Sequence, residues 1–188
     1  VGSERCLSCE RSMRISPGTE WRLHVMNPTI RAATSADLPA ILGLYDELEG
    51  PGFEPDPVRA ESVFERIRRY PAYTVYVLCQ ESRVLGTFAL LIMDNLAHGG
   101  APSGIVEDVV VRADHQGLGL GKMMMHFAMD VCRQPGCYKL MLSSNQKRVT
   151  AHVFYESLGF DRHGFSFVVP LRSVSDDPAP SPFTGSHR

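Results

Sequence analysis

A glycine-rich turn follows a strand and opens a helix in the second half of this chain, and it limits both the fold and the ligand that the chain can have. Residues 104–111 have the β-branched content of a strand, and the glycine-rich run 116–122 leads into a helix over 120–133. Glycines let the backbone approach a ligand closely, and N–H groups at a helix N-terminus carry partial positive charge. We therefore expect this turn to bind a phosphate or pyrophosphate group.

The glycine spacing differs from two familiar phosphate-binding motifs. A P-loop requires GxxxxGK followed by Ser or Thr, whereas this chain has GxxxGK, and Met123 occupies the hydroxyl position. A dinucleotide-binding fingerprint requires GxGxxG, whereas this chain has GxGxG without the acidic residue that closes a βαβ unit. From the glycines alone, a helix entry without any ligand remains the alternative.

Strand-like and helix-like segments alternate around this turn. Short β-rich runs predict strands, and apolar residues at helical spacing predict helices. The expected strands are 29–34, 73–79, 83–93, 104–111, 138–143 (short and buried) and 165–171. The expected helices run from Ser35 or Asp37 to about Leu48, from a Gly/Pro break at 50–57 to about Arg69, and over 120–133 and 147–158. With 73–93 as a hairpin, this order predicts a single α/β domain with a mixed central sheet flanked by helices.

Composition changes at both ends of the chain. Residues 1–28 mix Gly, Ser, Pro and charges without a helical or strand period, and residues 173–188 are rich in Pro, Ser and Asp. We expect a flexible N-terminal arm over 1–28, the α/β domain over 29–172 and a disordered tail over 173–188. Cys6 and Cys9 form a lone CxxC without a second pair of ligands, so the sequence predicts no metal site.

Charge and cysteine content narrow the expected partners. The 188 residues carry 19 Lys+Arg against 21 Asp+Glu, a net charge of −2. Nucleic acids and anionic membranes are bound through a basic field, so we expect neither as a partner. No apolar run approaches the roughly 20 residues that span a bilayer, and no signal-peptide segment is recognisable. Five cysteines, an odd number in a chain of this length, favour a reduced protein in the cytoplasm.

The window around the turn resembles the acetyl-CoA motif of the GNAT superfamily of N-acetyltransferases, written Q/R-x-x-G-x-G/A. The matching residues are Gln116, Gly117, Leu118, Gly119, Leu120 and Gly121. A second landmark of the superfamily, a short strand followed by a helix ending FYESLGF, matches Phe154 to Phe160. Both motifs occur in the expected order, and the resemblance covers about 29–171.

Within the superfamily, the segments VEDVVV, QGLGLGK and GCYKL resemble the glucosamine 6-phosphate N-acetyltransferase branch. Two positions depart from that branch. Ser143 stands where an acidic residue is expected, and Pro170 stands where a basic residue holds the sugar phosphate. The stretch between GCYKL and FYESLGF is also about three residues longer.

The resemblance implies that acetyl-CoA is the co-substrate. Backbone N–H groups at the strand end and in the turn are the implied contacts, joined by two side chains after the next strand. These cofactor-binding residues are Val109, Val110, Val111, Gln116, Gly117, Leu118, Gly119, Leu120, Gly121, Lys122, Asn145 and Arg148.

The resemblance also implies the catalytic groups. Glu107 is the expected general base and Tyr155 the expected acid that protonates the leaving thiolate. Asp108 is the alternative base, and because neighbours on a strand alternate, we expect its side chain opposite that of Glu107. A purely structural reading is also open: the carboxylates can pair with arginines, and the tyrosine can be a core aromatic.

The expected function is acetyl-CoA-dependent N-acetylation of a primary amine on a small molecule, with an amino sugar phosphate as one candidate and a homodimer as the expected assembly. Acetylation of a protein or peptide amine is one alternative, and a non-catalytic acyl-CoA sensor is another. Retention of Glu107 and Tyr155 argues against a sensor, which needs only the turn. We expect the acceptor pocket between 49–57, 94–100 and the last strands, where carboxylates can receive a cationic amine (Asp46, Glu49, Glu54, Asp56).

Overall fold

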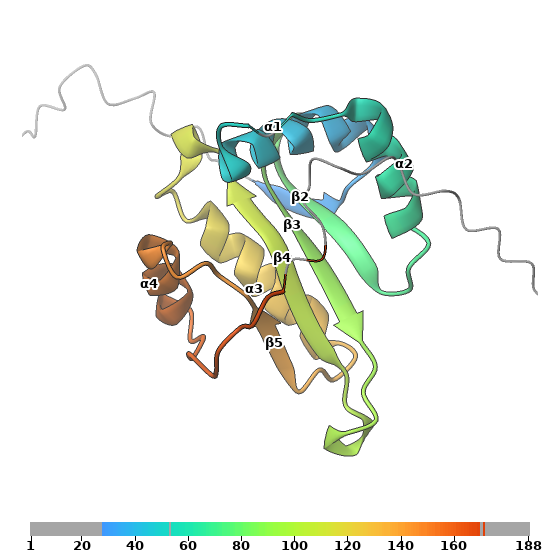
Figure 1. Cartoon of the computed structure of the whole chain (residues 1–188), viewed down its shortest axis with the longest axis vertical. Coiled ribbons are helices and arrows are strands. Elements are labelled where there is room, and N and C mark those ends of the chain that lie inside the picture. Colours follow the sequence, from blue (N-terminus) through green and yellow to red (C-terminus); the bar gives the residue numbers. More distant parts are fainter. Residues whose placement is uncertain (1–27, 53, 170, 172–188) are drawn as a thin grey trace, which may run out of the picture.

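One five-stranded sheet organises the computed structural model, which describes residues 28–52, 54–169 and 171 (Figure 1). Across the sheet the strands are β1 (Thr29–Ala32), β2 (Tyr73–Gln80), β3 (Arg83–Met93), β4 (Ser103–Val111) and β5 (Lys139–Leu142). Neighbours from β1 to β4 are antiparallel, whereas β4 and β5 are parallel. The predicted mixed α/β sheet, with its 73–93 hairpin, is confirmed.

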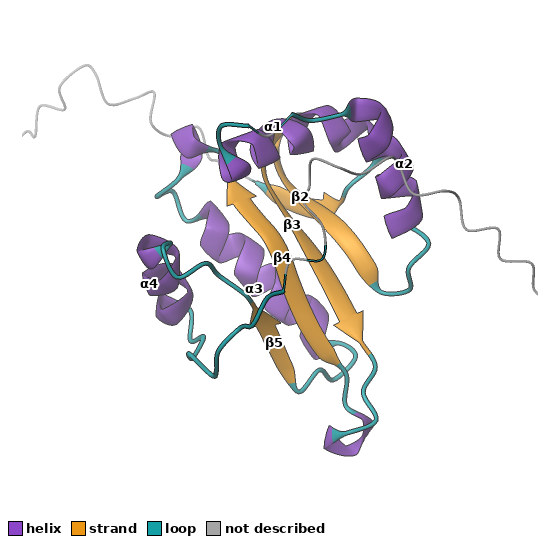
Figure 2. Cartoon of the chain, viewed as in Figure 1, coloured by secondary structure: helices purple, strands orange, loops and turns teal. Residues whose placement is uncertain are grey.

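Helices cover both faces of this sheet (Figure 2). α1 (Leu38–Glu49) and α2 (Pro57–Ile67) pack on one face, and α3 (Leu120–Arg133) and α4 (Val149–Ser157) contact the opposite one. Short 3-10 turns complete the described chain: η2 (Ser35–Asp37), η3 (His98–Gly100) and η4 (Ala113–His115). The helices therefore lie where the apolar spacing predicts them.

Two apolar clusters fix the sheet between these helices. On the α3 face, Phe88, Met124 and Met125 are fully buried, so these two methionines of the helix are core residues. On the other face, Ile41 and Phe64 pack against β2, β3 and β4. Because β4 is packed on both faces, the site at its carboxyl end rests on a rigid strand.

The buried carboxylate of Asp37 fixes the start of α1. It accepts hydrogen bonds from both terminal nitrogens of Arg31, at 2.7 and 2.8 Å, and from the Thr34 N–H and hydroxyl, at 2.8 and 2.9 Å. The hydrogen bonds from Arg31 are the main reason that the pKa of Asp37 falls to about 2. This contact joins β1 to the helix that forms one side of the site.

Two predictions about the far end of the sheet are wrong. The segment 138–143 is not buried, because the side chains of β5 alternate between exposed and half-buried. The segment 165–171 forms no strand in its described part, where Phe165 and Phe167 are 88% and 92% exposed. A β-rich segment needs a neighbouring strand to pair its backbone. In the described structure this segment does not pair with β5, whose outer edge has no neighbouring strand.

Some expectations fall outside the residues that the structure describes. The arm over 1–28, apart from Pro28, and the tail over 173–188 are not described, nor are Cys6 and Cys9. The regular elements run from Thr29 to Ser157, inside the expected 29–172 domain. Within the described ranges, no helix combines the length and apolar character needed to cross a membrane.

Candidate active site

The sheet opens where β4 and β5 separate. Their parallel pairing ends at Val106 and Leu142, after which β5 stops and β4 continues to Val111. A pocket of about 300 Å³ lies there, at the carboxyl end of parallel strands, where α/β sheets commonly bind ligands. Its lining comes from α1, β4, the end of β5 and α4: Leu48, Glu49, Val106, Glu107, Asp108, Val109, Leu142, Ser143, Ser144, Asn145, Arg148 and Tyr155.

A β-bulge turns two neighbouring carboxylates toward this pocket. The register of β3 against β4 shifts between Thr87 and Ala89, opposite the segment that holds Glu107 and Asp108. Asp108 adopts the left-handed conformation, with φ 53°, which Asp tolerates better than most residues. The prediction that the two side chains lie on opposite faces is wrong, because both carboxylates act on the phenol of Tyr73 and the bulge interrupts the alternation of the strand.

Both carboxyl groups have a raised pKa. For Glu107 the main cause is burial, and the negative charge of Asp108 adds to it. For Asp108 the main cause is also burial, followed by the charge of Glu49 at the end of α1. A carboxylate with a raised pKa is a stronger base than an ordinary one, so either group is suited to accept a proton from an amine.

Tyr155 reaches the same pocket from α4. Its ring packs against those of Phe154 and Phe160, with centroids 5.1 and 5.7 Å away. Burial raises the pKa of the phenol, and the positive charge of Arg148 partly opposes that shift. The phenol is therefore protonated at neutral pH and can donate its proton inside the pocket.

The glycine turn gives α3 an N-terminus without a side-chain cap. Gly117 and Gly119 have φ values of 76° and 82°, a conformation that most other residues avoid. Gly119 is the N-cap residue, and no side chain among the described residues bonds to the first N–H groups of α3. At Gly121 a Cβ atom would lie 3.2 Å from the Phe154 ring. These features fit a group of phosphate type, which would accept the free N–H groups.

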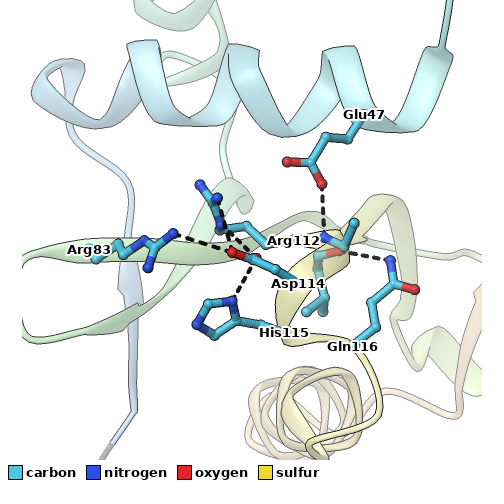
Figure 3. A network of polar contacts seen from close by, with 8 residues as sticks. Glu47, Arg83, Arg112, Asp114, His115 and Gln116 are labelled. Atoms are coloured by element: carbon cyan, nitrogen blue, oxygen red, sulfur yellow. Dashed lines mark hydrogen bonds and ion pairs between the residues drawn. The ribbon is translucent and has the colours of Figure 1, made fainter.

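A polar network ties the entry of the turn to its surroundings (Figure 3). Gln116 donates from Nε2 to the Val111 carbonyl oxygen at 3.0 Å, so its side chain holds the turn against the end of β4. Glu47 of α1 accepts a hydrogen bond from the Ala113 N–H at 2.9 Å. Asp114 pairs with Arg83, Arg112 and His115 in the same network. No pattern in the sequence indicated Glu47, because its contact depends on how α1 packs over the sheet.

Asn145 and Arg148 line the pocket between β5 and α4. The Asn145 side-chain oxygen accepts a hydrogen bond from the Lys147 N–H at 2.9 Å, which shapes the turn before α4. His152 of α4 donates from Nε2 to the Asn145 carbonyl oxygen at 3.0 Å and so holds the same turn. The Arg148 side chain remains exposed beside Tyr155.

The predicted site residues divide into two groups. Those that share the pocket are Glu107, Asp108, Val109, Asn145, Arg148 and Tyr155. Val110, Val111 and the residues from Gln116 to Lys122 lie outside its lining, along the continuing strand and turn. The predicted loop 94–100 does not line the pocket, and of the four expected acceptor carboxylates only Glu49 does. Leu142, Ser143 and Ser144 were missed, although the parallel pairing of β5 with β4 could have indicated them.

The sheet of this α/β domain opens beside a glycine-rich helix N-terminus, and the family match identifies its class as an acetyltransferase. The profile described as Acetyltransferase (GNAT) family matches residues 41–160, and the chain belongs to this family. The predicted resemblance to the GNAT superfamily and to its glucosamine 6-phosphate branch is thereby confirmed.

Named relatives and a solved structure agree with this membership. The chain is 36% identical over 99 residues to "Glucosamine 6-phosphate N-acetyltransferase" of Trypanosoma brucei brucei, covering 52% of this chain and 65% of that protein. It is 34% identical over 99 residues to the Arabidopsis thaliana protein of the same name, covering 51% and 64%. The matches thus span slightly less than two thirds of these relatives. A putative acetyltransferase from Agrobacterium tumefaciens has a TM-score of 0.72 and 31% identity, over 76% of this chain and 99% of that one.

Proposed function

We propose that this protein transfers the acetyl group of acetyl-CoA to a primary amine of a small molecule. The observation that carries the proposal is the convergence of Glu107, Asp108 and Tyr155 on one pocket, where β4 and β5 separate. The names of the relatives support a small acceptor such as an amino sugar phosphate.

For the donor, we propose binding along the end of β4 and the glycine turn. The open N–H groups from Gly117 to Lys122 suit the pyrophosphate, and the backbone from Val109 to Val111 suits the pantetheine arm. Asn145 and Arg148, on the other side of the pocket, complete this proposed donor site. Acetyl-CoA supplies an activated acetyl thioester.

For the chemistry, we assign one proton transfer to each side of the pocket. Glu107 accepts a proton from the incoming amine, directly or through water, with Asp108 as the alternative base. The amine nitrogen then bonds to the acetyl carbon, and the carbon–sulfur bond breaks. Tyr155 donates its proton to the departing sulfur. The raised pKa values of Glu107 and Tyr155 support these roles, since one group must accept and the other must donate.

A panel of amines tests this proposal. Thiol release from acetyl-CoA is followed with sugar amines, including glucosamine 6-phosphate, with alkyl amines and polyamines, and with peptides. We expect amine-dependent thiol release and a matching acetylated small molecule by mass spectrometry. Acetylation of peptides alone would support the protein-modifying alternative. Tight acetyl-CoA binding without turnover of any amine would support the sensor.

We further propose that the protein is a homodimer in the cytoplasm, with the 29–172 domain between an arm and a tail. Phe165, Phe167, Val168 and Val169 are 73–92% exposed in the described structure, and a second copy would bury them. The Ser143 and Ser166 hydroxyls lie 3.3 Å apart, so this segment passes the end of β5, whose outer edge is a natural pairing site. The three described cysteines are free thiols, which suits a reducing compartment.

A further inference from the structure

Three carboxylates line one side of the pocket. Glu49 comes from the end of α1, and Glu107 and Asp108 come from the bulge in β4. Their charges act on one another, since Glu49 raises the pKa of Asp108 and Asp108 raises that of Glu107. Arg148 supplies the only positive charge among the lining residues, and its field acts on Tyr155. The acceptor side of the pocket is therefore strongly anionic.

These carboxylates have no partner within the described structure. None of them takes part in an ion pair or a side-chain hydrogen bond among residues 28–52, 54–169 and 171. The other groups that face them are the phenols of Tyr45 and Tyr73, because the charge of Asp108 contributes to the raised pKa of both. Neutral phenols leave the negative charge in place.

Such a pocket discriminates between amines by charge. A phosphate group carries about −1.5 to −2 at neutral pH, so a position beside all three carboxylates disfavours a phosphate and favours an ammonium group. The nitrogen that is acetylated must lose its proton before it attacks, so its own charge cannot neutralise the pocket during the reaction. A second ammonium group on the same acceptor can do so.

Taking the proposed acetyl transfer as given, we propose that the acceptor is a small di- or polyamine. One of its amines is acetylated, and the pocket holds another. Glu49 and Asp108 receive the retained ammonium group, and Glu107 is left to accept the proton of the reacting amine. Glu49 then determines the specificity for the acceptor, although the acetyl transfer itself does not require this residue.

Matched acceptor pairs test this inference. 1,4-Diaminobutane is compared with 1-aminobutane, and 2-deoxystreptamine with cyclohexylamine, at saturating acetyl-CoA, with glucosamine 6-phosphate as the anionic acceptor. We expect kcat/KM to be about tenfold or more higher for each diamine than for its monoamine, as for a charge-assisted contact. The advantage should fall as ionic strength rises, because salt screens the pair.

Glu49→Gln identifies the residue responsible. This variant should raise KM for the diamines about tenfold and that for the monoamines by much less, so that the diamine preference is lost. Asp46→Asn, on the same helix but outside the pocket lining, is the matched control and should leave the diamine preference unchanged. Calorimetric binding of 1,4-diaminobutane to the CoA-bound protein gives a second readout, and Glu49→Gln should weaken it by the same factor.

The outcomes separate this inference from the proposed function. If glucosamine 6-phosphate is acetylated more efficiently than every diamine, or if Glu49→Gln affects diamines and monoamines equally, the inference is overturned while acetyl transfer stands. If no amine of any class is acetylated, the proposed function fails and the inference fails with it.

Discussion

Glu107 and Asp108 are adjacent in β4, yet both side chains line the same pocket, because the β-bulge holds Asp108 in a left-handed conformation. In a regular strand one of them would face the opposite side of the sheet. The bulge therefore places two carboxyl groups close together, and the charge of Asp108 adds to the burial that raises the pKa of Glu107. This arrangement links a backbone irregularity to the basicity of the proposed catalytic group.

The first prediction concerns the pH dependence of activity. The base must be ionised to act, so kcat/KM should fall on the acid side, at a pH above the ordinary range of a glutamic acid. The charge of Asp108 raises the pKa of Glu107, so Asp108→Asn should shift this acid limb to lower pH. Glu107→Gln should lower the activity and move this limb to the higher pH at which the amine itself loses its proton, so that part of the activity returns there. A limb that moves to higher pH in Asp108→Asn but not in Glu107→Gln would reverse the two roles.

The second prediction concerns the glycine turn. Gly119→Asp should abolish calorimetric binding of acetyl-CoA, because a carboxylate would sit at the helix N-terminus proposed for the pyrophosphate. Gly119→Asn is the matched control, since Asn has the same shape, no charge and a tolerance for positive φ. Its affinity should fall by less than about tenfold, the cost of modest backbone strain. Equal affinities of the Asp variant and the parent would exclude this turn as the donor site.

The third prediction concerns Glu47, whose side chain holds the Ala113 N–H at the entry of the turn (Figure 3). Glu47→Ala should weaken acetyl-CoA binding about fivefold, in line with one lost hydrogen bond, through a less ordered turn. Glu47→Gln keeps an acceptor oxygen and should restore most of the affinity. If Ala and Gln behave alike, the contact does not position the turn.

The fourth prediction concerns stability in acid. Because the folded pKa of Asp37 is lowered to about 2, its contribution is complete above the ordinary pKa near 3.8 and is lost as pH falls toward 2. Asp37→Asn should reduce the free energy of unfolding by about 1–2 kcal/mol at pH 7, after allowance for the partly exposed Arg31. The gap between variant and parent in urea titrations should shrink between pH 4 and pH 2. Asp130→Asn, in an exposed pair with Arg133, is the control and should cost less than about 0.5 kcal/mol.

Local patterns in the sequence were sufficient for most of the fold. Alternation, glycines and helical spacing are local signals, carried by residues close together in the sequence. They predict the hairpin over 73–93, the strand before the glycine turn and the helix after it. The pocket could be anticipated in part for the same reason, since Glu107 and Tyr155 belong to recognisable motifs.

The features that sequence reasoning missed depend on contacts between distant segments. The conformation of Asp108 follows from the register of β3 against β4, which no pattern within β4 reveals. The segment after Phe165 has the residues of a strand but does not pair with the edge of β5 in the described structure, so propensity alone gave the wrong answer. The contact of Glu47 with Ala113 depends on where α1 packs.

Acetyl transfer inside the pocket is the central step of the proposed function, and Tyr155→Phe tests whether it occurs there. The variant keeps the ring that packs on Phe154 and Phe160, so its acetyl-CoA affinity should stay near the parent value. The measurement is the single-turnover rate of amide formation, followed by mass spectrometry with the best amine of the panel. We predict a rate about a hundredfold lower than that of the parent, the usual scale of a lost general acid. Equal rates in the two proteins would contradict the role of Tyr155, and no amide from the parent would contradict the proposed acetyl transfer.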